Sequence, residues 1–231
     1  MREVTTPASV AHPSGLDPNV VAKVVARRGR LHAFEALEAR RSALVVIDLN
    51  RASVEQDVGC QIIVPRINAV ATALRQAGGT VAWVRTQFHV TPNAIAIFGS
   101  DAARFAAELD PTAPGAHLWP ELAVDAADLH ALKQGFSAFF PGKCDLHDRL
   151  AERGIEHVLI AGTVTNVCCD SSARDACELG YRVTMISDAC AGHWHGLHEA
   201  ALATFYRCFG DVRPAADVIE LCRRGDDAEA T

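Results

Sequence analysis

Three residues of the sequence could together carry out acyl transfer, and each follows an apolar run. Asp48 and Lys133 end the runs SALVVID and DLHALK, and Cys168 comes shortly after the run HVLIAG. A cysteine is a nucleophile, a carboxylate can take and return its proton, and an ammonium group stabilises the negative charge between them. Each has a structural alternative: Asp48 could cap the following turn, and Lys133 could extend to water.

The surroundings of Cys168 predict a reactive thiol. In AGTVTNVCCD a glycine-containing turn leads into a predicted helix, and Cys168 lies in its first turn. The positive end of the helix dipole stabilises a thiolate there, and a nearby Lys133 would lower the thiol pKa further. The unpaired N–H groups of the same turn are natural donors for an oxyanion. We therefore expect one unusually acidic thiol.

The remaining cysteines and histidines give weaker signals. Cys169 is rotated by roughly 100° from Cys168 on a helix, so only one of the two can face a cleft, and a redox-sensing pair is the alternative. Four further cysteines lack metal-ligand spacing and are predicted to be small buried side chains: Cys177, Cys190, Cys208 and Cys222. Four histidines, among them an H-x-H pair without a third ligand, are expected in loops near the pocket mouth: His89, His117, His193 and His195.

An alternation of strands and helices must bring the candidate residues together. Apolar runs predict six strands, at residues 42–48, 80–86, 128–133, 157–162, 181–187 and 211–214. Helical spacing predicts crossover helices at residues 62–79, 144–154, 166–180, 195–208 and 215–223. This pattern indicates an α/β fold with a doubly wound, mostly parallel six-stranded sheet and helices on both faces. Such sheets bind ligands beyond the carboxyl ends of their strands, where all three candidate residues lie.

Two segments depart from this alternation. Prolines interrupt residues 87–125 and leave one short helical stretch, at 101–109, which we interpret as a substrate-facing insertion. Residues 1–41 carry no strand signal and are expected to wrap over the surface or over a partner.

The composition narrows the class of function. The chain has 231 residues, 49% of them hydrophobic, and a net charge of -6 without a basic run, so neither nucleic acid nor an anionic membrane is an expected partner. No apolar stretch approaches the roughly 20 residues that span a bilayer, and the N-terminus does not resemble a targeting segment. Eight cysteines in such a chain are expected to be reduced thiols. We expect a cytoplasmic protein that acts on a small molecule.

Taken together, these features resemble the isochorismatase-like cysteine hydrolase superfamily. The resemblance rests on Asp48 after a strand, on KQGFSAFF from Lys133, and on GTVTNVCCDSSARDA around Cys168. It implies an N-terminal extension (residues 1–41) and a hydrolase domain (residues 42–231). It further implies that Cys168 is the nucleophile, that Asp48 takes its proton and returns it to the leaving nitrogen, and that Lys133 balances the charge.

The resemblance also carries expectations about the reaction. It implies a cis peptide bond between Thr163 and Val164, with the N–H groups of Val164 and Cys168 facing the oxyanion. The family includes N-carbamoylsarcosine amidases and ureidoacrylate amidohydrolases, which implies a hydrolase of non-peptide C–N bonds that forms a thioester, needs no cofactor and assembles as a homodimer or homotetramer. The alternative is a non-catalytic or redox-responsive small-molecule-binding protein, in which Cys168 and Cys169 oxidise together.

Departures from the family pattern alter the expected pocket. Members usually read DMQNxF after the first strand, whereas this chain reads DLNRA. Nothing between Gln87 and Asp128 matches the metal ligands of nicotinamidases, so neither nicotinamide nor a metal is expected, and Cys168 argues against the vinyl-ether chemistry of isochorismatase itself. Arg51 would suit a substrate carboxylate, while Trp83, Phe136 and Phe139 have core packing as an alternative. The expected substrate-binding residues are Asn50, Arg51, Trp83, Gln87, Phe136, Phe139 and Thr165.

Overall fold

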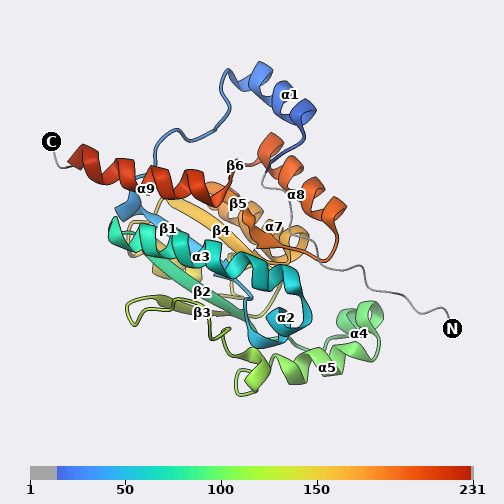
Figure 1. The fold of residues 1–231 in the computed structure, drawn as a ribbon. Coiled ribbons are helices and arrows are strands. Elements are labelled where there is room, and N and C mark those ends of the chain that lie inside the picture. Colours follow the sequence, from blue (N-terminus) through green and yellow to red (C-terminus); the bar gives the residue numbers. More distant parts are fainter. Residues whose placement is uncertain (1–14, 230–231) are drawn as a thin grey trace.

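A six-stranded parallel sheet forms the centre of the computed structural model, which describes residues 15–229 (Figure 1). The strands are β1 (Ser42–Ile47), β2 (Thr80–Thr86), β3 (Leu129–Lys133), β4 (His157–Thr163), β5 (Arg182–Ala191) and β6 (Asp211–Arg213). Their order is β3-β2-β1-β4-β5-β6, and every neighbouring pair is parallel. The predicted α/β fold class is confirmed, with a sheet that is entirely rather than mostly parallel.

Helices cover both faces of the sheet. They are α1 (Pro18–Arg28), α2 (Arg51–Gln56), α3 (Val58–Gln76), α4 (Pro92–Phe98), α5 (Asp101–Glu108), α6 (Leu146–Ala151), α7 (Asp170–Glu178), α8 (His195–Cys208) and α9 (Ala215–Glu229). Helices α3 and α9 lie together on one face of the sheet (Figure 1). Their side chains form one apolar core with the sheet, and those of α6, α7 and α8 form the other. Short 3₁₀ turns occur at Ala39–Arg41 and Pro114–Ala116.

The central strands are apolar throughout because they are buried on both faces. In β1, Val45 and Ile47 belong to the core under α6, α7 and α8, whereas Leu44 and Val46 belong to the core under α3 and α9. All six residues of β1 are buried. Successive side chains of a strand point to opposite faces, so a strand between two helical layers needs an unbroken apolar run.

Gly162 brings the carboxyl ends of β1 and β4 close together. It pairs in register with Ile47 and has a φ of +117°. A Cβ atom at this position would lie 2.1 Å from the Ile47 carbonyl oxygen, so only glycine allows the two backbones this approach. The approach places the turn after β4 directly beside the residue that follows β1.

The insertion after β2 is more regular than the sequence indicates. It contains α4 as well as the predicted helix, which is α5. The rings of Phe88, Phe98 and Phe105 contact one another edge to face, with centroids 5.6 to 5.8 Å apart. These three aromatic contacts hold both helices against the chain that leaves β2, despite the prolines that interrupt the periodicity.

The described part of the N-terminal extension packs on its own chain. Helix α1 begins with Asp17 as its N-cap and ends at Gly29, in the left-handed conformation. The Arg28 guanidinium lies 4.6 Å from the ring centre of Tyr206 in α8, and the Tyr206 hydroxyl donates to the Leu31 carbonyl. Residues 28–32 therefore lie against α8 and β6, on the surface of the chain, and the first 14 residues of the predicted extension lie outside the described residues.

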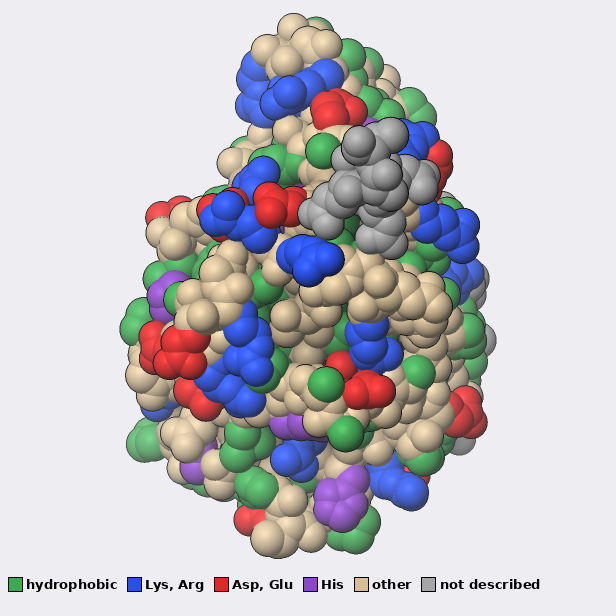
Figure 2. All heavy atoms as spheres, turned by 90° about the vertical axis from the view of Figure 1, so that its left-hand side faces the viewer, with side chains coloured by type: hydrophobic (Ala, Val, Ile, Leu, Met, Phe, Trp, Pro, Cys, Tyr) green, Lys and Arg blue, Asp and Glu red, His purple; other side chains and the backbone are tan. Residues whose placement is uncertain are grey.

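The surface carries mixed charge. Figure 2 shows acidic and basic side chains interspersed over one face of the molecule, with no field of a single sign. Within residues 15–229, no helix has the length and apolar character needed to cross a membrane.

Candidate active site

Asp48, Lys133 and Cys168 lie together at the carboxyl edge of the sheet. The Lys133 Nζ is 2.9 Å from Asp48 Oδ2 and 3.5 Å from Cys168 Sγ. Lys133 ends β3 and Asp48 follows β1, while Cys168 lies in a π-helical turn (Thr165–Cys169) between β4 and α7. The sheet thus brings together three residues that are far apart in sequence. Lys133 lies 85 positions after Asp48 and 35 positions before Cys168, and its ammonium group contacts both side chains.

The buried Lys133 ammonium is charged because its partners compensate for its burial. The side chain is 0% exposed. Burial disfavours the charged form, but the Asp48 carboxylate and the Cys168 sulfur outweigh it, so the pKa of Lys133 is raised above its ordinary value. A further hydrogen bond to the Gly135 carbonyl, at 2.9 Å, satisfies another of its protons. Lys133 is therefore a fixed cation and not a surface-reaching side chain.

The Cys168 thiol is not acidic, contrary to the sequence expectation. Burial and the neighbouring Asp48 carboxylate raise the pKa of Cys168 to about 12, although Lys133 acts in the opposite direction. The burial of the thiol and the charge of the carboxylate thus raise its pKa by more than the lysine and the helix dipole lower it. The resting thiol keeps its proton at neutral pH, so attack requires that a base remove it. Asp48, which hydrogen-bonds Cys168, is placed to be that base.

Two backbone features fix the site. Asp48 has a φ of 56°, in the left-handed region, and its N–H donates to the Val84 carbonyl at 2.9 Å. Aspartate tolerates this conformation better than most residues, and such backbone strain occurs at functional sites. The peptide bond between Thr163 and Val164 is cis, where the family resemblance placed it. The Cys169 N–H donates to the Val164 carbonyl at 3.2 Å, which closes the nucleophile turn on itself.

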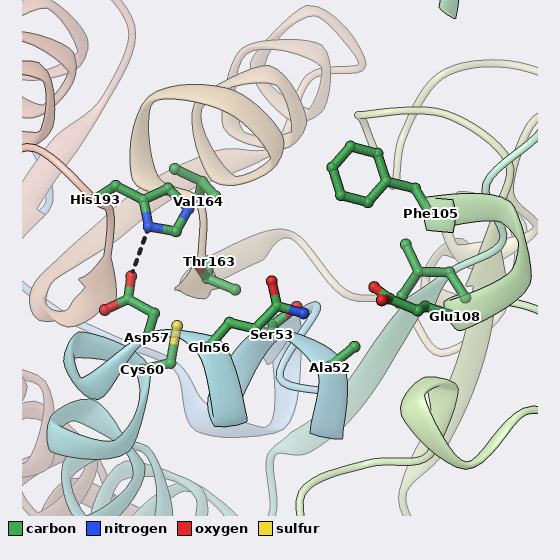
Figure 3. Close-up of a pocket in the computed structure, with 11 residues that line it drawn as sticks. Ala52, Ser53, Gln56, Asp57, Cys60, Phe105, Glu108, Thr163, Val164 and His193 are labelled. Atoms are coloured by element: carbon green, nitrogen blue, oxygen red, sulfur yellow. Dashed lines mark ion pairs between the residues drawn. The ribbon is translucent and has the colours of Figure 1, made fainter. Parts of the chain in front are cut away.

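A pocket of about 160 Å³ borders this turn (Figure 3). Thr163 and Val164 form one side of it, and Phe105 and Glu108 of α5 face them across the opening. Its floor comes from α2 and the start of α3: Ala52, Ser53, Gln56, Asp57 and Cys60. The insertion and the nucleophile turn therefore share a cavity, although Cys168 itself does not line it.

The structure brings few of the expected substrate-binding residues to an accessible position. Phe136 is 51% exposed, Gln87 is half-buried after β2, and Arg51 is half-buried beside Glu55. Asn50 is buried and caps α2 by accepting from the Ser53 N–H. None of these side chains lines the pocket in Figure 3.

Three more of the expected residues are structural. Trp83 is fully buried under α3, and its indole N–H donates to Asp128, so its alternative as a core residue is the correct interpretation. Phe139 is buried and packs edge to face on Tyr181. Thr165 is buried and its hydroxyl bonds His198 Nδ1 at 2.9 Å. Position at a strand end does not reveal which way a side chain points.

Several close pairs near the site were not predicted. Thr86 donates to Asp48 Oδ1 at 2.7 Å. His193 lies 3.1 Å from the buried Asp57, which caps α3, as the dashed line in Figure 3 shows. Burial and the neighbouring Cys190 thiol raise the pKa of Cys169.

The other polar candidates have structural partners. His195 pairs with Glu199 at 3.2 Å, and within residues 15–229 no three histidine, cysteine or acidic side chains gather as metal ligands would. All eight cysteines are free thiols. Cys190 and Cys222 are buried as expected, whereas Cys177 is only partly buried and Cys208 is exposed, because α8 turns it outward.

Comparisons with known proteins agree with this architecture. The sequence model of the isochorismatase domain matches residues 42–217. The chain is 30% identical over 184 residues to the uncharacterized isochorismatase family protein YwoC of Bacillus subtilis, which covers 80% of this chain and 95% of that protein. It is 28% identical over 205 residues to the ureidoacrylate amidohydrolase RutB of an Enterobacter species, covering 77% and 87% of the two.

A solved structure shares the fold. The crystal structure of a cysteine hydrolase from Pseudomonas syringae superposes with a TM-score of 0.74 at 23% identity, over 85% of this chain and 99% of that one. The family model matches most of the sequence, and the order of the strands is that of an α/β fold with a parallel sheet. The chain belongs to the isochorismatase-like hydrolase family.

Proposed function

We propose that the protein hydrolyses an amide or ureido C–N bond of a small molecule through a thioester on Cys168. The observation that carries this proposal is the position of Lys133 Nζ, 2.9 Å from the Asp48 carboxylate and 3.5 Å from the Cys168 sulfur. A fully buried lysine is costly, and a purely structural site gives no reason to gather a base, a cation and a thiol. The 28% identity to a ureidoacrylate amidohydrolase supports the same class of reaction.

The first half of the reaction forms the thioester. Asp48 takes the Cys168 proton as the sulfur attacks the carbonyl carbon, and the carbonyl π electrons move to oxygen. Lys133 keeps its charge and stabilises the developing thiolate. The N–H groups of Val164 and Cys168 face the oxyanion, a contribution of roughly 3 kcal/mol per donor. Collapse of the tetrahedral intermediate breaks the C–N bond, and the proton on Asp48 passes to the leaving nitrogen.

The second half returns the thiol. Water loses a proton to Asp48 and attacks the thioester carbon, which forms a second tetrahedral intermediate. Its collapse breaks the C–S bond, releases a carboxylic or carbamic acid, and returns the proton to sulfur. Because the resting thiol has a pKa of about 12, the cycle begins and ends with neutral sulfur.

Release of ammonia from a panel of primary carboxamides and N-carbamoyl compounds tests the proposal. We expect the wild type to release ammonia from at least one compound, and Cys168→Ala to lose at least about 10³-fold in rate, because no other group replaces the nucleophile. With hydroxylamine present, the wild type should convert the same compound to a hydroxamate by trapping the thioester.

Cys177→Ala is the matched control, since Cys177 lies on α7 and contacts the Phe209 carbonyl, outside the site. This variant should keep the wild-type rate. Equal ammonia release by Cys168→Ala and the wild type would overturn the nucleophile assignment. No release by the wild type from any compound would instead favour the binding-protein alternative.

A further inference from the structure

Thr86 lies at the centre of the hydrogen bonds that join Asp48 and Lys133. It is the last residue of β2, the strand between β1 and β3, and it is paired in register with Lys133. Its Oγ1 donates to Asp48 Oδ1 at 2.7 Å and accepts a hydrogen bond from Lys133 Nζ. One hydroxyl therefore bridges the carboxylate and the ammonium group.

The direction of these two hydrogen bonds is fixed by chemistry. An ammonium group only donates, and an ionised carboxylate only accepts, so the single hydroxyl proton of Thr86 must point to Asp48. Both carboxylate oxygens are thereby held, Oδ1 by Thr86 and Oδ2 by Lys133 at 2.9 Å. The plane of the carboxylate cannot turn about its bond to Cβ without breaking one of these contacts.

We infer that Thr86 is a positioning residue of the hydrolase site, which orients the Asp48 carboxylate. The inference rests on the proposed function, because the orientation matters only if Asp48 takes the Cys168 proton. A hydrogen bond to a charged group is shorter and stronger than one between neutral groups, so Thr86 restrains the carboxylate more than a neutral contact would.

Replacing the hydroxyl by a methyl group tests this role, because valine has nearly the volume of threonine and suits a strand. In Thr86→Val we expect kcat to fall about tenfold or more with a smaller change in KM, since the base and not the substrate loses a contact. Thr86→Ser, which keeps the hydroxyl, should restore most of the lost kcat.

Thr184→Val is the matched control. Thr184 lies buried in β5, and its hydroxyl bonds His157 Nε2 at 2.9 Å, away from the three residues of the site. The same loss of a buried hydroxyl there should lower stability without lowering kcat. Thr86→Ala serves as the second variant if Thr86→Val does not fold, as judged by circular dichroism.

A second readout separates this inference from the proposed function. Crystal structures of the wild type, Thr86→Val and Thr86→Ser give the orientation of the Asp48 carboxylate without any substrate. In Thr86→Val the plane of the carboxylate should turn away from the orientation that Thr86 and Lys133 hold, and in Thr86→Ser it should return. If no compound releases ammonia but this turn is present, the proposed reaction fails and the positioning role stands. An unchanged carboxylate together with unchanged kinetics in Thr86→Val, or equal changes in the valine and serine variants, would overturn the role of Thr86.

Discussion

At the residue scale, the proposed nucleophile, Cys168, gains reactivity only when the proposed base, Asp48, takes its proton. Burial and the Asp48 charge keep the Cys168 thiol protonated, with a pKa of about 12, whereas Lys133 favours the thiolate. An exposed thiolate would react with any electrophile or oxidant that reached it. A protonated thiol beside an oriented carboxylate reacts instead when a carbonyl carbon is in place to receive the sulfur.

The opposing effects of Asp48 and Lys133 on the thiol give a prediction. Asp48→Asn removes a negative charge that raises the pKa of Cys168, so alkylation of Cys168 by iodoacetamide at pH 9 should become faster. Lys133→Met removes a positive charge that lowers this pKa, so alkylation should become slower. Each pKa unit corresponds to about a tenfold change in thiolate fraction. Both variants should lose hydrolysis, and mass spectrometry of the Cys168 peptide follows the alkylation rates. Shifts in the same direction for both would show that charge does not control the thiol.

The residues of the site differ in how far the sequence reveals them. Asp48, Lys133 and Cys168 could be predicted because each interrupts or follows an apolar run with a group that is costly to bury. Thr86 could not, because threonine is an ordinary strand residue and its role depends on which strand lies between β1 and β3. The prediction that Trp83 binds substrate was wrong for a related reason. Its indole N–H donates to Asp128, which lies 45 positions later in the sequence, and this pairing cannot be read from either residue alone.

At the element scale, the approach of β1 and β4 depends on one glycine. Gly162 pairs with Ile47, and the turn that carries Val164 and Cys168 begins immediately after it. Any side chain at this position would push the turn away from the residue that follows β1. The position of the proposed oxyanion donors, Val164 and Cys168, relative to Asp48 therefore depends on a residue that has no side chain.

Gly162→Ala should be severely destabilising. Its Cβ would meet the Ile47 carbonyl oxygen at 2.1 Å, and the φ of +117° is unfavourable for any residue with a Cβ. We expect a loss of about 3 kcal/mol or more in the free energy of unfolding, measured by urea denaturation. Gly196→Ala is the control, because nothing lies within 4 Å of its Cβ position and alanine favours a helix such as α8. It should be neutral or slightly stabilising, and an equal loss in both variants would refute the argument from close approach.

The elements themselves were predicted unevenly. Buried strands have an unbroken apolar signal, and all six were found near their observed bounds. Helix α1 was missed although Asp17, Pro18 and Gly29 mark its ends, because its mostly exposed surface gives little apolar periodicity. Helices α2 and α4 were missed because each spans under two turns, and contacts such as those among Phe88, Phe98 and Phe105 stabilise them after folding.

At the scale of the whole molecule, buried thiols couple stability to pH. Burial raises the pKa of Cys60 to about 12 from an ordinary value near 9. Between these pH values the unfolded chain has released a proton that the folded chain retains, so the unfolded state binds fewer protons. The free energy of unfolding must then fall as pH rises through this window, by up to about 1.4 kcal/mol per pH unit for each such thiol. Cys168 acts in the same direction.

Cys60→Ser should make this alkaline loss of stability less steep, because a hydroxyl does not titrate in that range. The check is the slope of the unfolding free energy, from urea denaturation, between pH 9 and 10.5 in reducing buffer. Cys208→Ser, on the exposed surface of α8, is the matched control and should leave the slope as in the wild type. Equal slopes for Cys60→Ser and the wild type would show that Cys60 titrates alike in the folded and unfolded states.

The homo-oligomeric state stays a prediction, which light scattering of the full chain checks.

The strand order also divides the sheet into two halves that a single strand pairing joins. Strands β3, β2 and β1 come from the first 133 residues and β4, β5 and β6 from the rest, so only the β1–β4 pairing joins the two half-sheets. Asp48, Thr86 and Lys133 belong to one half, and Val164 and Cys168 to the other. Under the proposed function, the base and its cation are therefore synthesised before the nucleophile, and the reactive centre forms only when the two half-sheets pair. Turnover by the proposed reaction would then report on that pairing, which makes the chain a candidate for a split reporter divided between β3 and β4.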